Sequence, residues 1–192
     1  NGAMIVTVDP ETVVDVQTFD ATELLDDLAP LLPQATFAVE TMTGEFLTSR
    51  HFVDGGVSLH IREVPWAELT REPVVRLIAR SDHHLEEGLG PVIEHLDMHS
   101  IAFGVTDVAW LDLGIKGITK ATGLERLCAR LGIDPSEVLA IGDSMNDIEM
   151  LQWAGTAVVM GHAKPGILAL ADYVTTGIPG QGVVEVLDRL YA

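Results

Sequence analysis

A chain of 192 residues, 47% of them hydrophobic, can bury one large core or two small ones, so its composition indicates a folded globular protein. The formal net charge of -18 argues against nucleic-acid and anionic-membrane partners, because both need a footprint of Lys and Arg. No stretch approaches the roughly 20 apolar residues of a membrane span, and the single Cys128 excludes an intramolecular disulfide, so we expect a cytoplasmic protein.

The few positive charges gather in the second part of the chain. Residues 1–110 hold 19 of the 29 acidic residues but only 5 of the 11 basic ones, whereas all lysines (Lys116, Lys120 and Lys164) come later. A bound anion is therefore expected near these lysines, since positive charge must offset the acidic surroundings.

The order of predicted helices and strands in the first part of the chain is typical of an α+β domain. A Thr43-Gly44 turn between two short apolar runs is typical of a hairpin. Apolar periodicity predicts helices over 22–32 and 85–96 and strands over 36–39, 46–48, 74–79, 101–105 and 108–113.

Helices and strands alternate from Lys120 onward. The pattern predicts helices over 120–131, from 144 onward, over 167–171 and over 183–190, a single turn at 134–137, and strands over 138–141, 156–160 and 173–175. Such alternation implies a parallel sheet, in which ligands bind beyond the carboxyl ends of the strands. Asp143 directly follows one of these strands, so we expect it at that edge.

The segment from Gly142 to Asp147, which reads Gly-Asp-Ser-Met-Asn-Asp, is the most specific chemical signal. It places two carboxylates and an amide between an apolar strand and a helix. Mg²⁺ prefers such oxygen ligands and takes only one or two carboxylates, while the helix start offers N–H groups to an anion. The plainer interpretation is an acidic loop in which Ser144 and Asp147 form a capping box and nothing more.

Lys120 opens a predicted helix upstream of Asp143, with Lys116 one turn earlier. A lysine at a helix start usually lies on a solvated surface. A lysine close to Asp143 would instead hold a phosphate and neutralise the charge that develops on it.

These residues belong to a longer pattern that resembles a known family. The pattern is similar to the carboxyl half of the haloacid dehalogenase (HAD) superfamily, and within it to the Cof-type sugar-phosphatase branch, over residues 116–124, 138–151, 154–163 and 171–175. The resemblance implies an α/β fold, with a parallel Rossmann-like core, partial here, and an inserted α+β cap domain. The pattern of predicted elements and the charge both change near residues 111–115. Together with this change, the resemblance divides the chain into a core hairpin segment at 1–15, the cap at 16–110 and the carboxyl-terminal half of the core at 111–192.

The resemblance also implies roles for single residues. Lys120 would contact the nucleophile and the transferring phosphate, and Asp147 would orient Lys120 or a metal-bound water, so these two are the expected catalytic residues. Asp143 would be a ligand of Mg²⁺, and Asn146 would contact the phosphate group. Lys116 occupies a position without a fixed catalytic role.

Histidines raise two further questions. Where the family usually has Met-Gly-Asn-Ala, this chain has His162 in place of Asn, either as a loop residue or as a contact to substrate, and we favour the loop. The predicted cap contains four histidines, His83, His84, His95 and His99. They suggest a zinc site as a weaker alternative, although no carboxylate stands at a spacing that would support it.

The family mechanism needs an aspartate nucleophile in an Asp-x-Asp-x-Thr motif, which forms an aspartyl-phosphate that water then hydrolyses. In the Cof-type branch Asn-Gly-Ala follows the second motif, and here Asn1-Gly2-Ala3 opens the chain. We therefore expect the nucleophile upstream and this chain alone to be inactive. A rival nucleophile is Asp9, but Glu11 replaces the expected second aspartate and Pro10 removes an N–H donor.

These features together predict a Mg²⁺-dependent phosphatase of small phosphorylated metabolites, sugar phosphates above all. A phosphomutase is the nearby chemical alternative, and a non-catalytic binding or regulatory protein descended from such an enzyme is the alternative from another class. A partial core sheet would expose strand edges, so we also expect the chain to form homo-oligomers or to aggregate.

Overall fold

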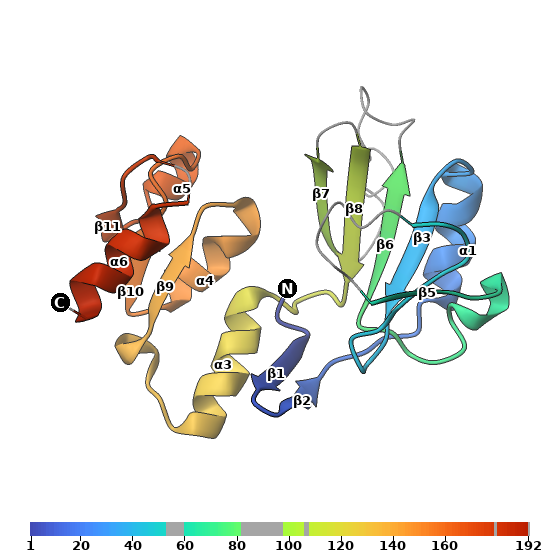
Figure 1. Cartoon of the computed structure of the whole chain (residues 1–192), viewed down its shortest axis with the longest axis horizontal. Helices are drawn as coiled ribbons and strands as arrows, with labels where there is room; N and C mark the ends of the chain where they lie inside the picture. Colours follow the sequence, from blue (N-terminus) through green and yellow to red (C-terminus); the bar gives the residue numbers. More distant parts are fainter. Residues whose placement is uncertain (53–59, 82–97, 106–107, 179, 192) are drawn as a thin grey trace. The chain divides into compact units, whose positions relative to one another are not determined.

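The computed structural model describes residues 1–52, 60–81, 98–105, 108–178 and 180–191, with the backbone alone for 99–105 and 108. These residues form two compact units. We call Ala3–Gly117 the cap unit, and Asn1–Gly2 together with Ile118–Ala192 the core unit. Figure 1 labels the elements of both.

The cap unit is built around a six-stranded sheet of order β5-β4-β3-β6-β8-β7, antiparallel except for the β4–β5 pair. Its elements are β1 (Met4–Val8), β2 (Glu11–Val16), α1 (Thr22–Leu31), β3 (Thr36–Glu40), β4 (Phe46–Thr48), β5 (Ile61–Glu63), a 3₁₀ turn (Trp66–Glu68), β6 (Arg76–Ser81), β7 (His99–Val105) and β8 (Val108–Gly114). The α+β pattern predicted from the sequence is confirmed, although β5 was not foreseen. The predicted helix over 85–96 lies outside the described residues.

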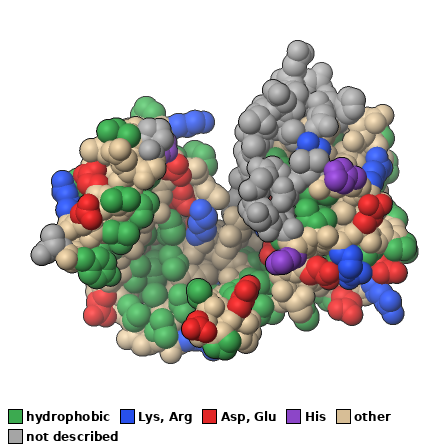
Figure 2. Space-filling model, in the orientation of Figure 1, with side chains coloured by type: hydrophobic (Ala, Val, Ile, Leu, Met, Phe, Trp, Pro, Cys, Tyr) green, Lys and Arg blue, Asp and Glu red, His purple; other side chains and the backbone are tan. Residues whose placement is uncertain are grey.

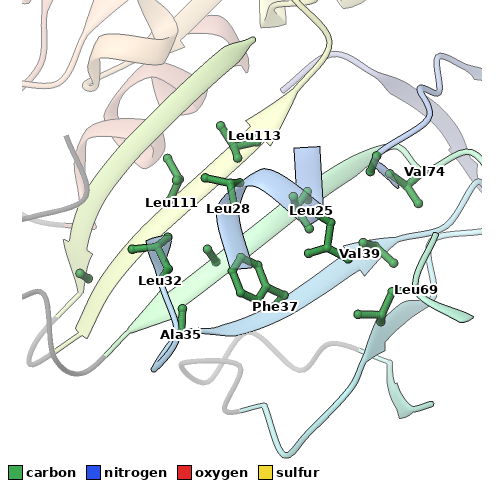
Figure 3. Close-up of a cluster of buried hydrophobic side chains, with 14 of the residues drawn as sticks. Leu25, Leu28, Leu32, Ala35, Phe37, Val39, Leu69, Val74, Leu111 and Leu113 are labelled. Atoms are coloured by element: carbon green, nitrogen blue, oxygen red, sulfur yellow. The ribbon is translucent and has the colours of Figure 1, made fainter. Parts of the chain in front are cut away.

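One face of this sheet packs against α1 (Figure 3). Leu25, Leu28 and Leu32 recur at helical spacing on the buried side of the helix. Alternate strand residues meet them, because successive side chains of a strand point to opposite faces, and this set comprises Phe37, Val39, Leu77, Ala79, Leu111 and Leu113. Leu111 and Leu113 show that the sheet extends past residue 110, where the cap was predicted to end.

The first strands of the chain form an antiparallel hairpin, in which β1 pairs with β2. Asp9 lies in its exposed turn. The hairpin predicted for this segment is thus confirmed, whereas Asp9 does not stand at the carboxyl end of a parallel core strand, as a nucleophile would have to. Its strand pairs antiparallel in a separate two-stranded sheet, so the rival nucleophile is wrong.

The core unit is an α/β layer with three parallel strands in the order β11-β10-β9. Its alternation of helices and strands matches the prediction, and its elements are α3 (Lys120–Leu131), a 3₁₀ turn (Pro135–Glu137), β9 (Leu139–Gly142), a 3₁₀ turn (Met145–Asp147), α4 (Ile148–Trp153), β10 (Thr156–Val159), α5 (Pro165–Leu168), β11 (Tyr173–Val174) and α6 (Gly182–Tyr191). None of the helices described in either unit has both the length and the apolar character that a membrane span requires.

The start of α3 is fixed by local contacts. Thr119 caps the helix, and its own N–H donates to Thr122 Oγ1 over 2.9 Å. Gly2 packs against this turn with φ +85°, so closely that a Cβ at Gly2 would lie 1.9 Å from the Thr119 carbonyl oxygen. Arg126 Nη2 donates to the Gly2 carbonyl over 2.7 Å. These contacts hold the helix turn that carries Lys120.

We expect Leu28→Ala to lower the free energy of unfolding of the cap unit by about 2–5 kcal/mol, because it leaves a cavity in the core. Leu28 is 0% exposed, whereas Leu31 on the same helix is 60% exposed. Leu31→Ala is therefore the matched control, with an expected loss below about 0.5 kcal/mol. Urea unfolding followed by tryptophan fluorescence measures both, and equal losses would contradict this description of the core.

Candidate functional site

The carboxyl ends of β9 and β10 bring two loops side by side. Val159 is in register with Gly142, and the Met160 N–H then donates to the Gly142 carbonyl over 3.0 Å. The chain therefore leaves both strands at one edge of the sheet. Asp143 follows β9 there, and His162 lies in the loop that follows β10.

Asp147 is the centre of the site. Its Oδ2 accepts the backbone N–H groups of Asp143 and Ser144, each over 3.0 Å. Its Oδ1 lies 2.5 Å from Lys120 Nζ, and the Asp147 side chain is only 5% exposed. Both carboxylate oxygens are thus engaged, and the Lys120 ammonium is tied to the loop after β9.

These contacts determine the charge state of Asp147. Burial alone would raise the pKa of this carboxyl, but the hydrogen bond from Lys120, those from the two N–H groups and the positive charge of Lys120 outweigh it. The pKa therefore lies below its ordinary value of 3.8. Asp147 is a carboxylate throughout the neutral pH range, and it forms an ion pair with Lys120.

Gly142 makes room for this carboxylate. A Cβ at Gly142 would lie 2.6 Å from Asp147 Cβ and 2.9 Å from Asp147 Cγ. Any larger residue at the end of β9 would therefore push the Asp147 side chain away from the two N–H groups that it accepts.

Asp143 is the accessible carboxylate of the site. Its side chain is 42% exposed. Ser144 Oγ donates to Asp143 Oδ1 over 3.0 Å, and His162 Nε2 lies 2.9 Å from Asp143 Oδ2. Because each carboxylate oxygen can accept more than one partner, Asp143 keeps lone pairs for a cation.

The oxygen donors of the site fit a Mg²⁺ ion that is held by few protein ligands. Mg²⁺ keeps several waters and uses one or two carboxylates together with substrate phosphate. Asp143 can supply one carboxylate, whereas the oxygens of Asp147 are already occupied. No cage of three or more His, Cys, Asp or Glu side chains occurs among the described residues.

The other predicted residues are placed as follows. Asn146 lies partly buried in the 3₁₀ turn before Asp147, and its amide has no hydrogen-bond partner in the described part of the chain. Lys116 is exposed and belongs to the cap unit. The zinc alternative falls on residues outside the described ranges, apart from the backbone of His99.

The structure thus joins Lys120 to Asp147 directly and Asp147 to the Asp143 backbone, with Asn146 in the same turn. Asp147 does accept the Ser144 N–H, as the capping interpretation requires, but its bond to Lys120 goes beyond capping. Sequence reasoning missed the contact of His162 with Asp143. The parallel register of the two strands was the signal that could have revealed it.

A family model described as haloacid dehalogenase-like hydrolase matches residues 67–187, more than half of the chain. The chain belongs to the haloacid dehalogenase-like hydrolases, which confirms the family inferred from the motifs.

Curated relatives match shorter segments. The phosphoglycolate phosphatase of Methanothrix thermoacetophila is 42% identical over 77 residues, which are 40% of this chain and 35% of that protein. The 5-amino-6-(5-phospho-D-ribitylamino)uracil phosphatase of Escherichia coli is 36% identical over 114 residues, which are 59% of this chain and 39% of that protein. The chain therefore spans well under half the length of these two relatives.

Solved structures match almost the whole chain. A haloacid dehalogenase-like hydrolase from Bacteroides thetaiotaomicron superposes with a TM-score of 0.77 at 24% identity, covering 99% of this chain and 74% of that one. A HAD subclass IIB sugar phosphatase gives a TM-score of 0.76 at 22% identity, covering 99% and 73%. This likeness establishes the fold, an α/β Rossmann-like HAD core with an α+β cap.

We expect Gly142→Ala to destabilise the core unit by about 1–3 kcal/mol, because the added methyl group overpacks the space of Asp147. Gly166→Ala is the matched control: a Cβ there meets nothing within 4 Å, and Gly166 lies in α5. The control should be neutral or slightly stabilising, since Ala favours helices over Gly. Thermal unfolding compares the two variants, and a neutral Gly142→Ala would contradict the close contact.

We expect Asp147→Asn to lower the free energy of unfolding by about 1–3 kcal/mol at pH 7, because an amide cannot accept both N–H groups and pair with Lys120. The pKa of Asp147 is lower in the folded state, so its stabilising effect is present above its ordinary value of 3.8 and is lost as the pH falls through the folded pKa.

The difference between the wild type and Asp147→Asn should therefore shrink below about pH 4. Denaturant unfolding between pH 2 and 7 measures it, and Glu149→Gln, at an exposed carboxylate on α4, is the control. A difference that stays constant down to pH 2 would contradict the lowered pKa.

Proposed function

We propose that this chain forms part of a Mg²⁺-dependent phosphatase that hydrolyses small phosphomonoesters, sugar phosphates above all. The observation that carries the proposal is the Lys120–Asp147 ion pair, held beside Asp143 and Asn146 at the carboxyl edge of a parallel sheet. Family membership supports hydrolase chemistry, and this edge is where such sheets bind ligands.

Lys120 binds the phosphate in this proposal. An ammonium group has three N–H donors, and Asp147 accepts one, which leaves two for a phosphate oxygen and the attacking carboxylate. Asp147 sets the position of the ammonium group, whose positive charge stabilises the negative charge that develops on the phosphate. The Asn146 amide, which has no partner among the described residues, donates to another phosphate oxygen.

Asp143 would hold the Mg²⁺ ion, with waters and substrate oxygens completing its shell. When bound, Mg²⁺ supplies positive charge that clamps and neutralises the phosphate oxygens. Ser144 Oγ and His162 Nε2 flank the Asp143 carboxylate and set its orientation.

The nucleophile in this proposal is an aspartate on a further parallel strand that pairs with the open side of β9. In the described residues β9 pairs on one side only, with β10. Leu139 on β9 is exposed, as are Leu131 and Ile133 of the same unit, and Figure 2 shows hydrophobic side chains gathered on this unit. The unpaired edge of a strand presents N–H and C=O groups that can pair with another strand, which supports an additional strand here.

The chemistry then follows in two steps. A carboxylate oxygen of the nucleophile bonds to phosphorus while the ester oxygen leaves and takes a proton from the second aspartate of the Asp-x-Asp-x-Thr motif. Water next gives a proton back to that second aspartate and attacks the phosphorus, which releases inorganic phosphate and restores the carboxylate of the nucleophile. Lys120 and Asn146 hold the phosphate oxygens through both steps.

The substrate class is supported by what the relatives share. The curated relatives are named as phosphatases of phosphoglycolate and of a phosphorylated ribityl compound, and a structural relative as a sugar phosphatase. All of these names describe small phosphomonoesters. The excess of acidic residues in the first part of the chain disfavours highly anionic substrates.

We expect the natural gene product that contains this chain to hydrolyse p-nitrophenyl phosphate and sugar phosphates when Mg²⁺ is added but not after all divalent cations are removed, and the 192-residue chain alone to be inactive. In the gene product, Lys120→Ala and Asp143→Ala should each lower kcat/KM by about 10²-fold or more, because each removes charge stabilisation of the transferring phosphate. Phosphate release measures the rates, and Lys116→Ala, at a lysine outside the core unit, is the control.

Each other outcome supports a different function. A gene product that binds sugar phosphates without turning them over would support the non-catalytic binding protein. Transfer of the phosphate between hydroxyl groups of one sugar would support the phosphomutase. Hydrolysis that survives both site substitutions would overturn the proposed site.

A further inference from the structure

We propose that His162 is a second protein ligand of the metal at Asp143, and that it gives this site a preference for borderline transition ions such as Co²⁺ over Mg²⁺. The inference rests on the proposed function in one respect, namely that Asp143 holds the metal. It departs from the sequence-based expectation that His162 is a loop residue.

The fold brings His162 to Asp143 through the sheet itself. Because the Met160 N–H donates to the Gly142 carbonyl, the chain leaves β9 and β10 at the same level. Asp143 is one residue beyond the first strand end, and His162 follows two residues after Met160. The two side chains meet across the sheet edge, with His162 Nε2 at 2.9 Å from Asp143 Oδ2.

The loop that carries His162 is held on both sides. A Cβ at Gly161 would lie 2.3 Å from the Thr175 carbonyl oxygen, so the backbone presses against the end of the neighbouring strand. Ala163 is buried, and its N–H donates to the Met160 carbonyl over 2.9 Å. The imidazole therefore projects from a fixed backbone, as a ligand must if binding is not to cost much ordering entropy.

The spacing of the two atoms suits a shared cation. Donors about 2.1 Å from one ion and at right angles to each other are separated by about 3 Å. Nε2 and Oδ2 already lie at nearly this separation. A cation bound to both atoms would lie to one side of the line that joins them, so the imidazole ring would turn toward the ion while the two donor atoms keep nearly their present separation.

The pair of donors also predicts which ions are preferred. Imidazole nitrogen suits transition ions, while Mg²⁺ selects oxygen donors. His162 and Asp143 are 41% and 42% exposed, so water can complete the shell. With asparagine at position 162, as is usual in the family, the donors would all be oxygens. The histidine therefore changes the donor set at the position closest to Asp143.

The test is metal binding by the 192-residue chain, with no substrate present. Co²⁺ binding is followed by its visible absorption and by the hyperfine-shifted imidazole N–H resonance in the ¹H NMR spectrum, and Mg²⁺ binding by calorimetry. The variants are His162→Asn, which restores the usual family residue, and Asp143→Asn. The chain has seven histidines, so His51→Asn, at an exposed histidine of the cap unit, reports adventitious binding.

We expect His162→Asn to weaken Co²⁺ binding by about 10–100-fold or more, because loss of a direct ligand should cost at least as much as loss of a group that only supports a ligand. Mg²⁺ binding should be unchanged, and the shifted imidazole resonance should disappear. His51→Asn should alter none of these signals. Asp143→Asn should weaken the binding of both ions.

The remaining outcomes overturn the inference in distinguishable ways. If Asp143→Asn abolishes Mg²⁺ binding while His162→Asn leaves Co²⁺ binding and its resonances intact, the proposed function stands and only the role of His162 fails. If His51→Asn removes the Co²⁺ signal, the ion was adventitious. If neither ion binds the wild type, the metal assignment of Asp143 fails as well.

Discussion

The buried carboxylate of Asp147 is the constraint on which the site depends. A carboxylate can be buried only if its oxygens find donors, because an unpaired buried charge is strongly destabilising. Asp147 finds them in two amides of its own loop and in Lys120, which comes from another helix. Satisfying this one charge therefore closes the loop after β9, places Asp143 at the sheet edge and aims the lysine, all at once.

The same requirement explains residues that have no chemical role of their own. Gly142 has no side chain because the carboxylate occupies that space. Thr119 and Gly2 fix the first turn of α3, so that the lysine reaches Asp147 without searching many conformations. The geometry of the site thus depends on small residues and on a helix-capping residue, each of which restricts the position of a neighbouring group. Asp143, by contrast, stays half-exposed, as a residue that must accept a cation and a substrate should.

Much of the fold was predictable because helices and strands produce recognisable patterns in the local sequence. The periodicity around Leu25 and Leu28 and the alternation after Lys120 gave the right elements, since each burial pattern is repeated over several residues. The short strand β5 was not predicted, because a segment of three residues is too short to show periodicity. The strand predicted over 108–113 is present as β8, and it continues the sheet past residue 110, where the change of charge had suggested a boundary.

The site was predictable only in part, and for a physical reason. The resemblance brought Lys120 and Asp147 together across the sequence, and the structure pairs them. The contact of His162 with Asp143 depends on strand register, which no single segment encodes. Strand pairing also decides the case of Asp9. The apolar segment before Asp9 resembles a core strand in its local sequence, but it pairs antiparallel in a hairpin.

The anchoring of Gly2 has a mechanical consequence. The chain passes between the two units twice, after Gly2 and before Ile118. Gly2 is pinned to Thr119 and Arg126, so both crossings leave the core unit from the same turn of α3. The opening residues of the chain therefore support the turn that carries Lys120, so a substitution at Gly2 would disturb a lysine that lies far away in the sequence.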